Sequence, residues 1–258
     1  MLSLNQIEQQ YPEFLRSFKR DILREYLQCK ILEIVFNSKF ADKLSFLGGT
    51  ALRLIYDNNR FSEDLDFDNF GITEAEFDAL AGEIKAGLEA QGLETEIGTA
   101  HKGAYRCSIR LPEILFANEL SPYKDEKILI HIDSAAHDFS YQPERKVINK
   151  FDVFSEILVT PADILLSQKI YAAMNRKRAK GRDFYDIVFL LSFARPNYEY
   201  LKNKIGINNS SELKEKIIKV TGGLDFEELA RDVERFLFDP GDVKRIKMFI
   251  SYMKSLDF

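Results

Sequence analysis

The stretch FLGGTALRLIYDNNRFSEDLDFD, residues 46–68, decides how this chain is interpreted. Two glycines meet a threonine, and Asp64, Asp66 and Asp68 then occupy alternate positions. On a strand, residues two apart point to the same face, so the three carboxylates would project together while the apolar residues between them anchor a core. Carboxylates this close repel each other unless a cation or raised pKa values relieve the repulsion. The stretch is either a polar edge strand or loop, or a strand built to hold a positive group.

The glycines before the acids indicate which ligand could bring the positive group to this site. Residues 43–47 are typical of a short strand, and a helix with Thr50 as its N-cap should follow the turn. Gly48 and Gly49 allow a ligand to approach the backbone closely, and the first helical turn directs free N–H groups at an anion. Magnesium prefers one or two carboxylates together with phosphate oxygens. The turn and the acids therefore favour a metal-bound nucleoside triphosphate over a solvated loop.

Two-metal phosphoryl transfer would need a third carboxylate. Asp133 stands in KILIHIDSA, residues 127–135, a strongly apolar strand in which a lone aspartate would be costly to bury. We expect Asp133 to be the general base that takes a proton from an attacking hydroxyl, and Asp64, Asp66 and Asp133 to bind the metal. His131 faces the same way and either lines the site or is a hydrogen-bonded core histidine.

Composition narrows the class of protein. Hydrophobic residues make up 45% of the 258 residues, which is ample for a core, and 36 basic against 41 acidic residues leave a formal net charge of −5. Bulk charge therefore does not indicate a nucleic-acid binder, although a local patch could still act as one. The two cysteines form neither a metal-ligand spacing nor a disulfide framework. With no signal pattern and no apolar run near the roughly 18 residues that span a bilayer, we expect a cytoplasmic protein.

The first part of the chain mixes helices and strands. Residues 6–38 have helical spacing, and residues 73–90 should form a helix that opens with a Thr-x-x-Glu capping box. Three strand-like runs follow, at residues 93–99, 104–111 and 127–134.

The second part is helical throughout. Pro161 suits the first turn of a helix that reaches about Arg178, and glycines and prolines divide the chain after Asp183 into further helices. We therefore predict an α+β fold, with a small mixed β-sheet core and flanking helices in residues 1–160 and an all-α half in residues 161–258. The helices should pack so that Lys169 and Asp183 close the cleft over the acids.

A second block, SQKIYAAMNRKRAKGRDFYDIVFLL, spans residues 167–191. Lys169 lies beside the apolar stripe of its helix, where it either pairs with a counter-charge such as a triphosphate or extends to the surface. Arg60 and Ser62, in the first block, could touch substrate phosphates or have turn-forming and surface roles. The segment RKRAKGRD carries five cations, which form either a solvated helix end or a surface that binds RNA phosphates. They are Arg176, Lys177, Arg178, Lys180 and Arg182.

Both blocks carry a family resemblance. Gly48-Gly49-Thr50 followed by Asp64-x-Asp66 resembles the signature of the DNA-polymerase-β-like nucleotidyltransferases. The fuller string LGGTALRL…RFSEDLDFD, together with the second block, resembles the AbiEii/AbiGii toxin family, the nucleotidyltransferase half of type IV toxin–antitoxin systems. On this resemblance Lys169 would hold the triphosphate and Asp183 would be the later active-site aspartate, with Arg182 and Asp186 beside it.

The resemblance implies a nucleotidyltransferase that uses Mg²⁺ or Mn²⁺ and an NTP, with a cognate antitoxin as partner. The acceptor it implies is RNA, above all the 3′ end of tRNA, whose modification would block translation. A small-molecule or protein acceptor, or an inactive nucleotide-binding regulator, are the alternatives. The residues expected to bind the nucleotide are Gly48, Gly49, Thr50, Ser62, Lys169 and Arg182.

Overall fold

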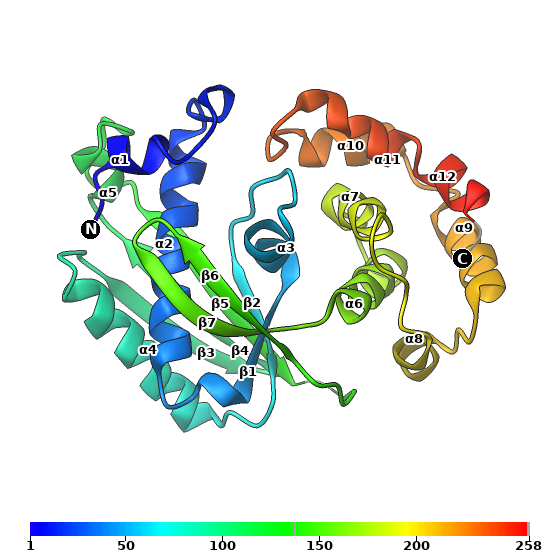
Figure 1. The fold of residues 1–258 in the computed structure, drawn as a ribbon, viewed down its shortest axis with the longest axis horizontal. Coiled ribbons are helices and arrows are strands. Elements are labelled where there is room, and N and C mark those ends of the chain that lie inside the picture. Colours follow the sequence, from blue (N-terminus) through cyan, green and yellow to red (C-terminus); the bar gives the residue numbers. More distant parts are fainter. Residues whose placement is uncertain (137, 257–258) are drawn as a thin grey trace. The chain divides into compact units, whose positions relative to one another are not determined.

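The chain divides into two units, shown in the colours of the sequence in Figure 1. Unit 1 comprises Met1–Asp57 and Phe61–Thr160, and unit 2 comprises Asn58–Arg60 and the chain from Pro161 onward. The computed structural model describes residues 1–136 and 138–256. In these residues no helix is both long and apolar enough to cross a membrane.

Unit 1 is built on a seven-stranded mixed sheet with the order β3-β4-β5-β2-β1-β7-β6. Neighbouring strands are antiparallel except for two parallel pairs, β2 with β5 and β1 with β7. The strands are β1 Leu44–Leu47, β2 Leu65–Asn69, β3 Glu96–Lys102, β4 Ala104–Leu111, β5 Ile128–Ala136, β6 Glu144–Lys150 and β7 Val153–Val159. Neither β7 nor β6 was predicted from the sequence. Strand β6 lies at the edge of the sheet beside β7, and its charged residues show no apolar alternation.

The helices of unit 1 are α1 Leu4–Glu8, α2 Lys19–Asn37, α3 Gly48–Tyr56, α4 Glu74–Glu89 and α5 Ile114–Ala117. The capping box of α4 is confirmed, because Thr73 and Glu76 cap each other's backbone N–H groups. The continuous helix over residues 6–38 is wrong. Pro12 lacks an N–H and disfavours helical backbone at the preceding residue, so a short 3₁₀ turn at Glu13–Leu15 separates α1 from α2.

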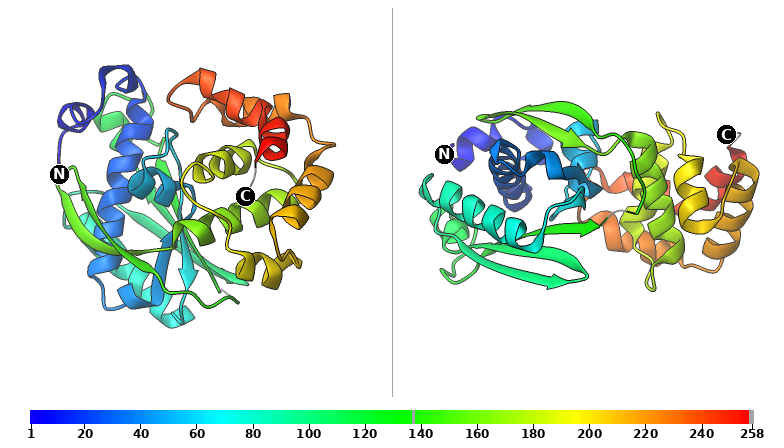
Figure 2. Two further views of the ribbon diagram at one scale, coloured as in Figure 1. Left: turned by 45° about the vertical axis from the view of Figure 1, so that its right-hand side comes forward. Right: turned by 90° about the horizontal axis from the view of Figure 1, so that it is seen from below.

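The two faces of the sheet differ in character. Helices α2 and α4 pack against each other and against the sheet (blue and teal in Figure 2). On this side the Phe67 ring lies 5.6 Å from that of Phe46 and 6.1 Å from that of Phe36. Because successive strand residues alternate between faces, the same register places Asp66 and Asp133 on the opposite face.

Unit 2 is all-α, as predicted for the second half. Its helices are α6 Ala162–Asn175, α7 Gly181–Leu190, α8 Tyr198–Ile205, α9 Ser210–Thr221, α10 Phe226–Glu234, α11 Lys244–Lys247 and α12 Phe249–Ser255. Phe184, Phe226 and Phe249 form an aromatic cluster in its core, with ring centroids 4.9 to 5.8 Å apart. At Gly181 an added Cβ would lie 1.8 Å from the carbonyl oxygen of Leu229, so only glycine allows α7 to approach α10 this closely.

Candidate active site

The glycine turn of unit 1 lies directly against one of the predicted acids. Gly48 has a φ of +81°, in the left-handed region, and an added Cβ there would lie 2.2 Å from Asp66 Oδ2. Glycine is therefore required both by the backbone and by the carboxylate. Helix α3 begins at this glycine with Leu47 as its N-cap and no side-chain cap, so the prediction of Thr50 as the N-cap is wrong.

Thr50 instead joins the two halves of the motif. Its buried hydroxyl donates a hydrogen bond to the carbonyl oxygen of Asp64, the residue before β2. The hydroxyl is therefore committed to holding α3 beside β2. A nucleotide at this turn would meet the N–H groups of a helix that has no side-chain cap.

The structure brings Asp64, Asp66 and Asp133 together. Strands β2 and β5 run parallel with Asp66 opposite Asp133, so the two carboxylates project from the same face of neighbouring strands, which lie about 4.8 Å apart. Asp64 Oδ1 accepts a hydrogen bond from the backbone N–H of His131 at 3.3 Å. We call this side of the sheet, with these three aspartates, the acid face.

Arg106 completes the acid face and was missed from the sequence. It stands opposite Asp133 in the register of β4 and β5, and its Nε and Nη2 lie 2.6 and 2.8 Å from the two oxygens of Asp133. The hydrogen bonds to Asp133 and its charge raise the pKa of the Arg106 guanidinium, and the charges of Asp64 and Asp66 add to that effect. The alternation of β4 marks Arg106 as polar-facing, but its partner depends on a strand register that the sequence does not display.

Asp68, the third acid of the opening stretch, has a separate role. It is buried and accepts a hydrogen bond of 2.6 Å from the hydroxyl of Tyr141, which lies 2.8 Å from Thr160 Oγ1. Burial and the charge of Asp68 raise the pKa of Tyr141. This arrangement uses Asp68 as a structural acceptor and leaves the other acids for chemistry.

His131 and Ser62 lie near the predicted acids in sequence, and each is hydrogen-bonded to a residue of another element. The ring nitrogen Nδ1 of His131 is 3.0 Å from Ser108 Oγ, and His131 is half-buried. The carbonyl oxygen of Ser62, also half-buried, accepts a hydrogen bond of 3.0 Å from Gln28. The role predicted for Ser62 in nucleotide binding stays a prediction.

The donor chemistry of the acid face suits a hard divalent cation, which prefers carboxylate oxygens. Within residues 1–136 and 138–256 no group of three or more His, Cys, Asp or Glu side chains is already arranged to hold a metal ion. Instead the guanidinium of Arg106 supplies the positive charge at Asp133. The residue types therefore fit a metal, and the charge that a metal would supply is in part provided by Arg106.

In unit 2, Lys169 and the two aspartates of the second block form an ion-pair cluster. Lys169 Nζ lies 3.5 Å from Asp183 Oδ1 and 2.8 Å from Asp186 Oδ2, and Arg176 Nε lies 2.9 Å from Asp183 Oδ2. Both aspartates are fully buried. The counter-charge that Lys169 needs therefore comes from the protein, and its predicted role at the triphosphate stays a prediction.

Arg60 is the largest member of this cluster. Its Nε lies 2.7 Å from Oδ1 of Asp186, and its Nη2 lies 2.7 Å from Oδ2. The side-chain amide of Asn58 also donates a hydrogen bond of 3.0 Å to Oδ1 of Asp186. Burial disfavours the charged form of Asp186, but the charges of Arg60 and Lys169 outweigh burial and lower its pKa to about 2. Arg60 is only 1% exposed, so neither a phosphate contact nor a surface role fits it.

Of the five cations of RKRAKGRD, Arg176 stands at a helix end, because it is the C-cap of α6, which stops at Asn175. Since α7 starts at Gly181, the next three cations lie in the connection between the helices and Arg182 lies in the first turn of α7. The charge of Arg182, then burial, then the charge of Arg176 lower the pKa of Lys180. This lowering indicates a positive local potential, which would attract phosphate.

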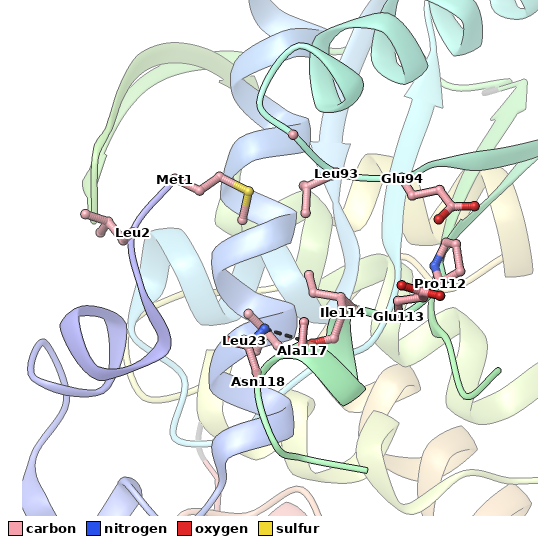
Figure 3. A pocket seen from close by; sticks show the side chains of 11 residues that line it. Met1, Leu2, Leu23, Leu93, Glu94, Pro112, Glu113, Ile114, Ala117 and Asn118 are labelled. Carbon is pink, nitrogen blue, oxygen red and sulfur yellow. Dashed lines mark hydrogen bonds between the residues drawn. The ribbon is translucent and has the colours of Figure 1, made fainter. Parts of the chain in front are cut away.

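A hollow of about 380 Å³ in unit 1 contains none of the predicted site residues. Figure 3 shows its lining, which includes Met1, Leu23, Leu93 and Ile114. The lining also contains Glu94, Glu113 and Asn118, but none of the residues predicted for the site, so the acid face remains the candidate site.

Comparisons with known proteins bear on the family and the fold of the chain. The sequence model of the family described as "Nucleotidyl transferase AbiEii toxin, Type IV TA system" matches residues 30–246. JHP933 from Helicobacter pylori has a similar structure, with a TM-score of 0.56 and 19% identity over 91% of this chain and 91% of that one. The nucleotidyltransferase toxin MenT4 from Mycobacterium tuberculosis is similar with a TM-score of 0.56 and 15% identity, over 100% of this chain and 91% of that one. These two structures share the fold, and no curated protein matches in a sequence comparison.

Proposed function

Because the chain belongs to the AbiEii family of nucleotidyltransferase toxins, we propose that it transfers a nucleotide from an NTP to RNA, at the 3′ end of tRNA, and thereby blocks translation. The observation that carries the proposal is the packing of Asp66 against the glycine turn, with Asp133 beside it in the sheet register. This arrangement places an anion-binding helix start next to carboxylates that suit a cation. The type IV family also implies a cognate antitoxin.

Each group of the acid face has a part in this reaction. The N–H groups at the start of α3 bind the triphosphate, and Asp64, Asp66 and Asp133 would hold Mg²⁺ or Mn²⁺, which neutralises phosphate charge when bound. Asp133 takes the proton of the acceptor hydroxyl. The hydroxyl oxygen then forms a bond to the α-phosphorus, the bond from that phosphorus to the bridging oxygen breaks, and pyrophosphate leaves with the electron pair.

The family resemblance assigns triphosphate binding to Lys169 and a supporting role to Asp183. A phosphate oxygen is an anion like the carboxylates that Lys169 now contacts, so it can replace Asp183, the more distant of the two partners at 3.5 Å. Asp186, at 2.8 Å, would keep the ammonium group in place during that exchange.

Incubation with each labelled NTP and unfractionated tRNA, with Mg²⁺ or Mn²⁺, tests the proposal. We expect labelled tRNA from the native protein, none in EDTA, and none from Asp66→Asn, which should stay folded because it relieves clustered negative charge. An Asp66→Asn protein that unfolds while its soluble remainder keeps full activity would refute the metal role. Label on a small molecule or protein and never on RNA would refute the RNA acceptor.

A further inference from the structure

A hollow of about 340 Å³ lies on the acid face beside Asp133. It is lined by Ala100 and Lys102 of β3, Ala104 and Arg106 of β4, and Asp133 of β5. We call it the β3–β4 hollow. The lining therefore combines two methyl side chains, two cations and one carboxylate.

The register of the sheet gives this hollow a defined position relative to the nucleotide turn. Arg106 pairs with Asp133, Asp133 pairs with Asp66, and Asp66 pairs with Leu47, the residue before the glycines. Asp133 therefore stands between the glycine turn on one side and the hollow on the other. A general base must contact the acceptor hydroxyl, and in-line attack brings that hydroxyl to the side of the phosphorus opposite the leaving group. With the triphosphate at the glycine turn, as proposed above, the hollow lies on the side of Asp133 from which the acceptor would approach.

Charge identifies the kind of acceptor. Lys102 and Arg106 bring two positive charges to the hollow and Asp133 brings one negative charge, so a phosphodiester would supply the second negative charge and an uncharged acceptor would not. We propose that the β3–β4 hollow binds the terminal phosphodiester of an RNA acceptor, and that Arg106 passes from Asp133 to this phosphate when the acceptor binds. The inference rests on the proposed nucleotidyl transfer to RNA, and it adds where the RNA end lies.

The move of Arg106 from Asp133 to a phosphate has a low free-energy cost and changes the surroundings of Asp133. Its side chain is 55% exposed and that of Asp133 is 29% exposed, so water can solvate both groups as they separate. A guanidinium forms the same two-point contact with a phosphate as with a carboxylate. While Arg106 holds both oxygens of Asp133, it occupies a lone pair on each of them. When Arg106 moves to the phosphate, both oxygens become open to the acceptor hydroxyl.

Binding of a short single-stranded oligoribonucleotide to the full chain, without NTP, tests the hollow directly. We expect Arg106→Ala to weaken binding roughly tenfold and to reduce the log–log salt slope by about 0.7, as expected when one phosphate is no longer neutralised. Arg106→Lys should bind with intermediate affinity, because it keeps the charge and loses the two-point geometry. Mn²⁺ should bind more tightly to Arg106→Ala than to the native protein, since a cation has left the acids.

Arg145→Ala is the matched control. Arg145 lies on β6 of the same sheet and forms an exposed ion pair of 2.6 Å with Glu156 on the neighbouring strand, outside the hollow. It should bind RNA and Mn²⁺ as the native protein does. If Arg106→Ala binds RNA as tightly as the native protein, or if Arg145→Ala loses as much RNA affinity, the proposed role of the hollow is wrong, even if tRNA is labelled in the transfer assay. A selective loss in Arg106→Ala would support it even if no nucleotide is transferred to RNA, in which case only the proposed function fails.

Discussion

The acid face of unit 1 and the ion-pair cluster of unit 2 use the same kinds of side chain under different conditions. On the acid face, the pair of Arg106 and Asp133 is 55% and 29% exposed, so it contributes about 0–1 kcal/mol. In the cluster, Arg60 and Asp186 are 1% and 0% exposed, so each charge depends on the other for its solvation. The first pair can exchange partners, whereas the second cannot separate without a cost to the fold.

The difference in exposure indicates which ion pair could take part in a reaction and which one supports the fold. A site must release its own contacts to bind substrate, and the exposed pair can do so. The buried pair instead fixes Asp186, which in turn holds Lys169 at 2.8 Å. The cluster is therefore a rigid support for one lysine, and the acid face is an adaptable surface.

Arg60→Ala should have the largest effect. It leaves Asp186 buried without its two-point partner, and we expect the free energy of unfolding to fall by about 3–5 kcal/mol in chemical denaturation. Arg145→Ala, which removes an arginine from an exposed pair, should change it by less than about 0.5 kcal/mol. Equal losses from the two variants would contradict the contrast between buried and exposed pairs.

Gly48→Ala should have the next largest effect, because it introduces both backbone strain and a clash with Asp66. We expect the free energy of unfolding to fall by about 2–4 kcal/mol, with loss of nucleotide transfer. Gly92→Ala is the control: its φ of +84° is nearly the same, but nothing lies within 4 Å of the added Cβ. Gly92→Ala should lose only the stability that corresponds to the backbone strain, and it should keep nucleotide transfer. An active Gly48→Ala protein as stable as Gly92→Ala would show that Asp66 does not need the turn.

The sequence predicted the acid face better than the cluster, for a physical reason. Alternation along a strand is local, so the order of residues alone places Asp66 and Asp133 on polar faces. Their partners depend on contacts between distant segments. Arg106 reaches Asp133 through strand register, and Arg60 reaches Asp186 across 126 positions of the chain. No local pattern distinguishes such an arginine from one that faces solvent.

Asp186 should also give unit 2 an acid-sensitive stability. Its folded pKa of about 2 lies below the ordinary value of 3.8, so the ionised form is stabilised by folding. This contribution, about 2 kcal/mol, is fully present above about pH 5 and is lost as the pH falls through 2. Asp186→Asn lacks it, so the difference in unfolding free energy between native and variant should narrow by that amount between about pH 5 and 1. A difference that stays constant with pH would show that Asp186 is not strongly paired.

The smallest effect on stability is expected in the cationic connection between α6 and α7. Lys177 and Arg178 are exposed, and neutralising them together with Lys180 should change the free energy of unfolding by less than about 0.5 kcal/mol. If they contact RNA phosphates, the variant Lys177→Gln, Arg178→Gln and Lys180→Gln should bind tRNA more weakly. Its log–log salt slope should fall by about 0.7 for each phosphate that the variant no longer neutralises. Affinity for the triphosphate should change far less.

A control that removes the same amount of charge separates phosphate contacts from a general field. The exposed lysines Lys39, Lys124 and Lys219 lie on other parts of the chain, and changing all three to glutamine lowers the net charge equally. A field effect would weaken tRNA binding alike in both variants, because long-range steering depends on total charge. Direct contacts would reduce the salt slope only in the first. If the first variant binds and modifies tRNA like the native protein at every salt concentration, the connection between α6 and α7 does not bind RNA phosphates. The acceptor would then be held by Arg106 and Lys102 of the β3–β4 hollow.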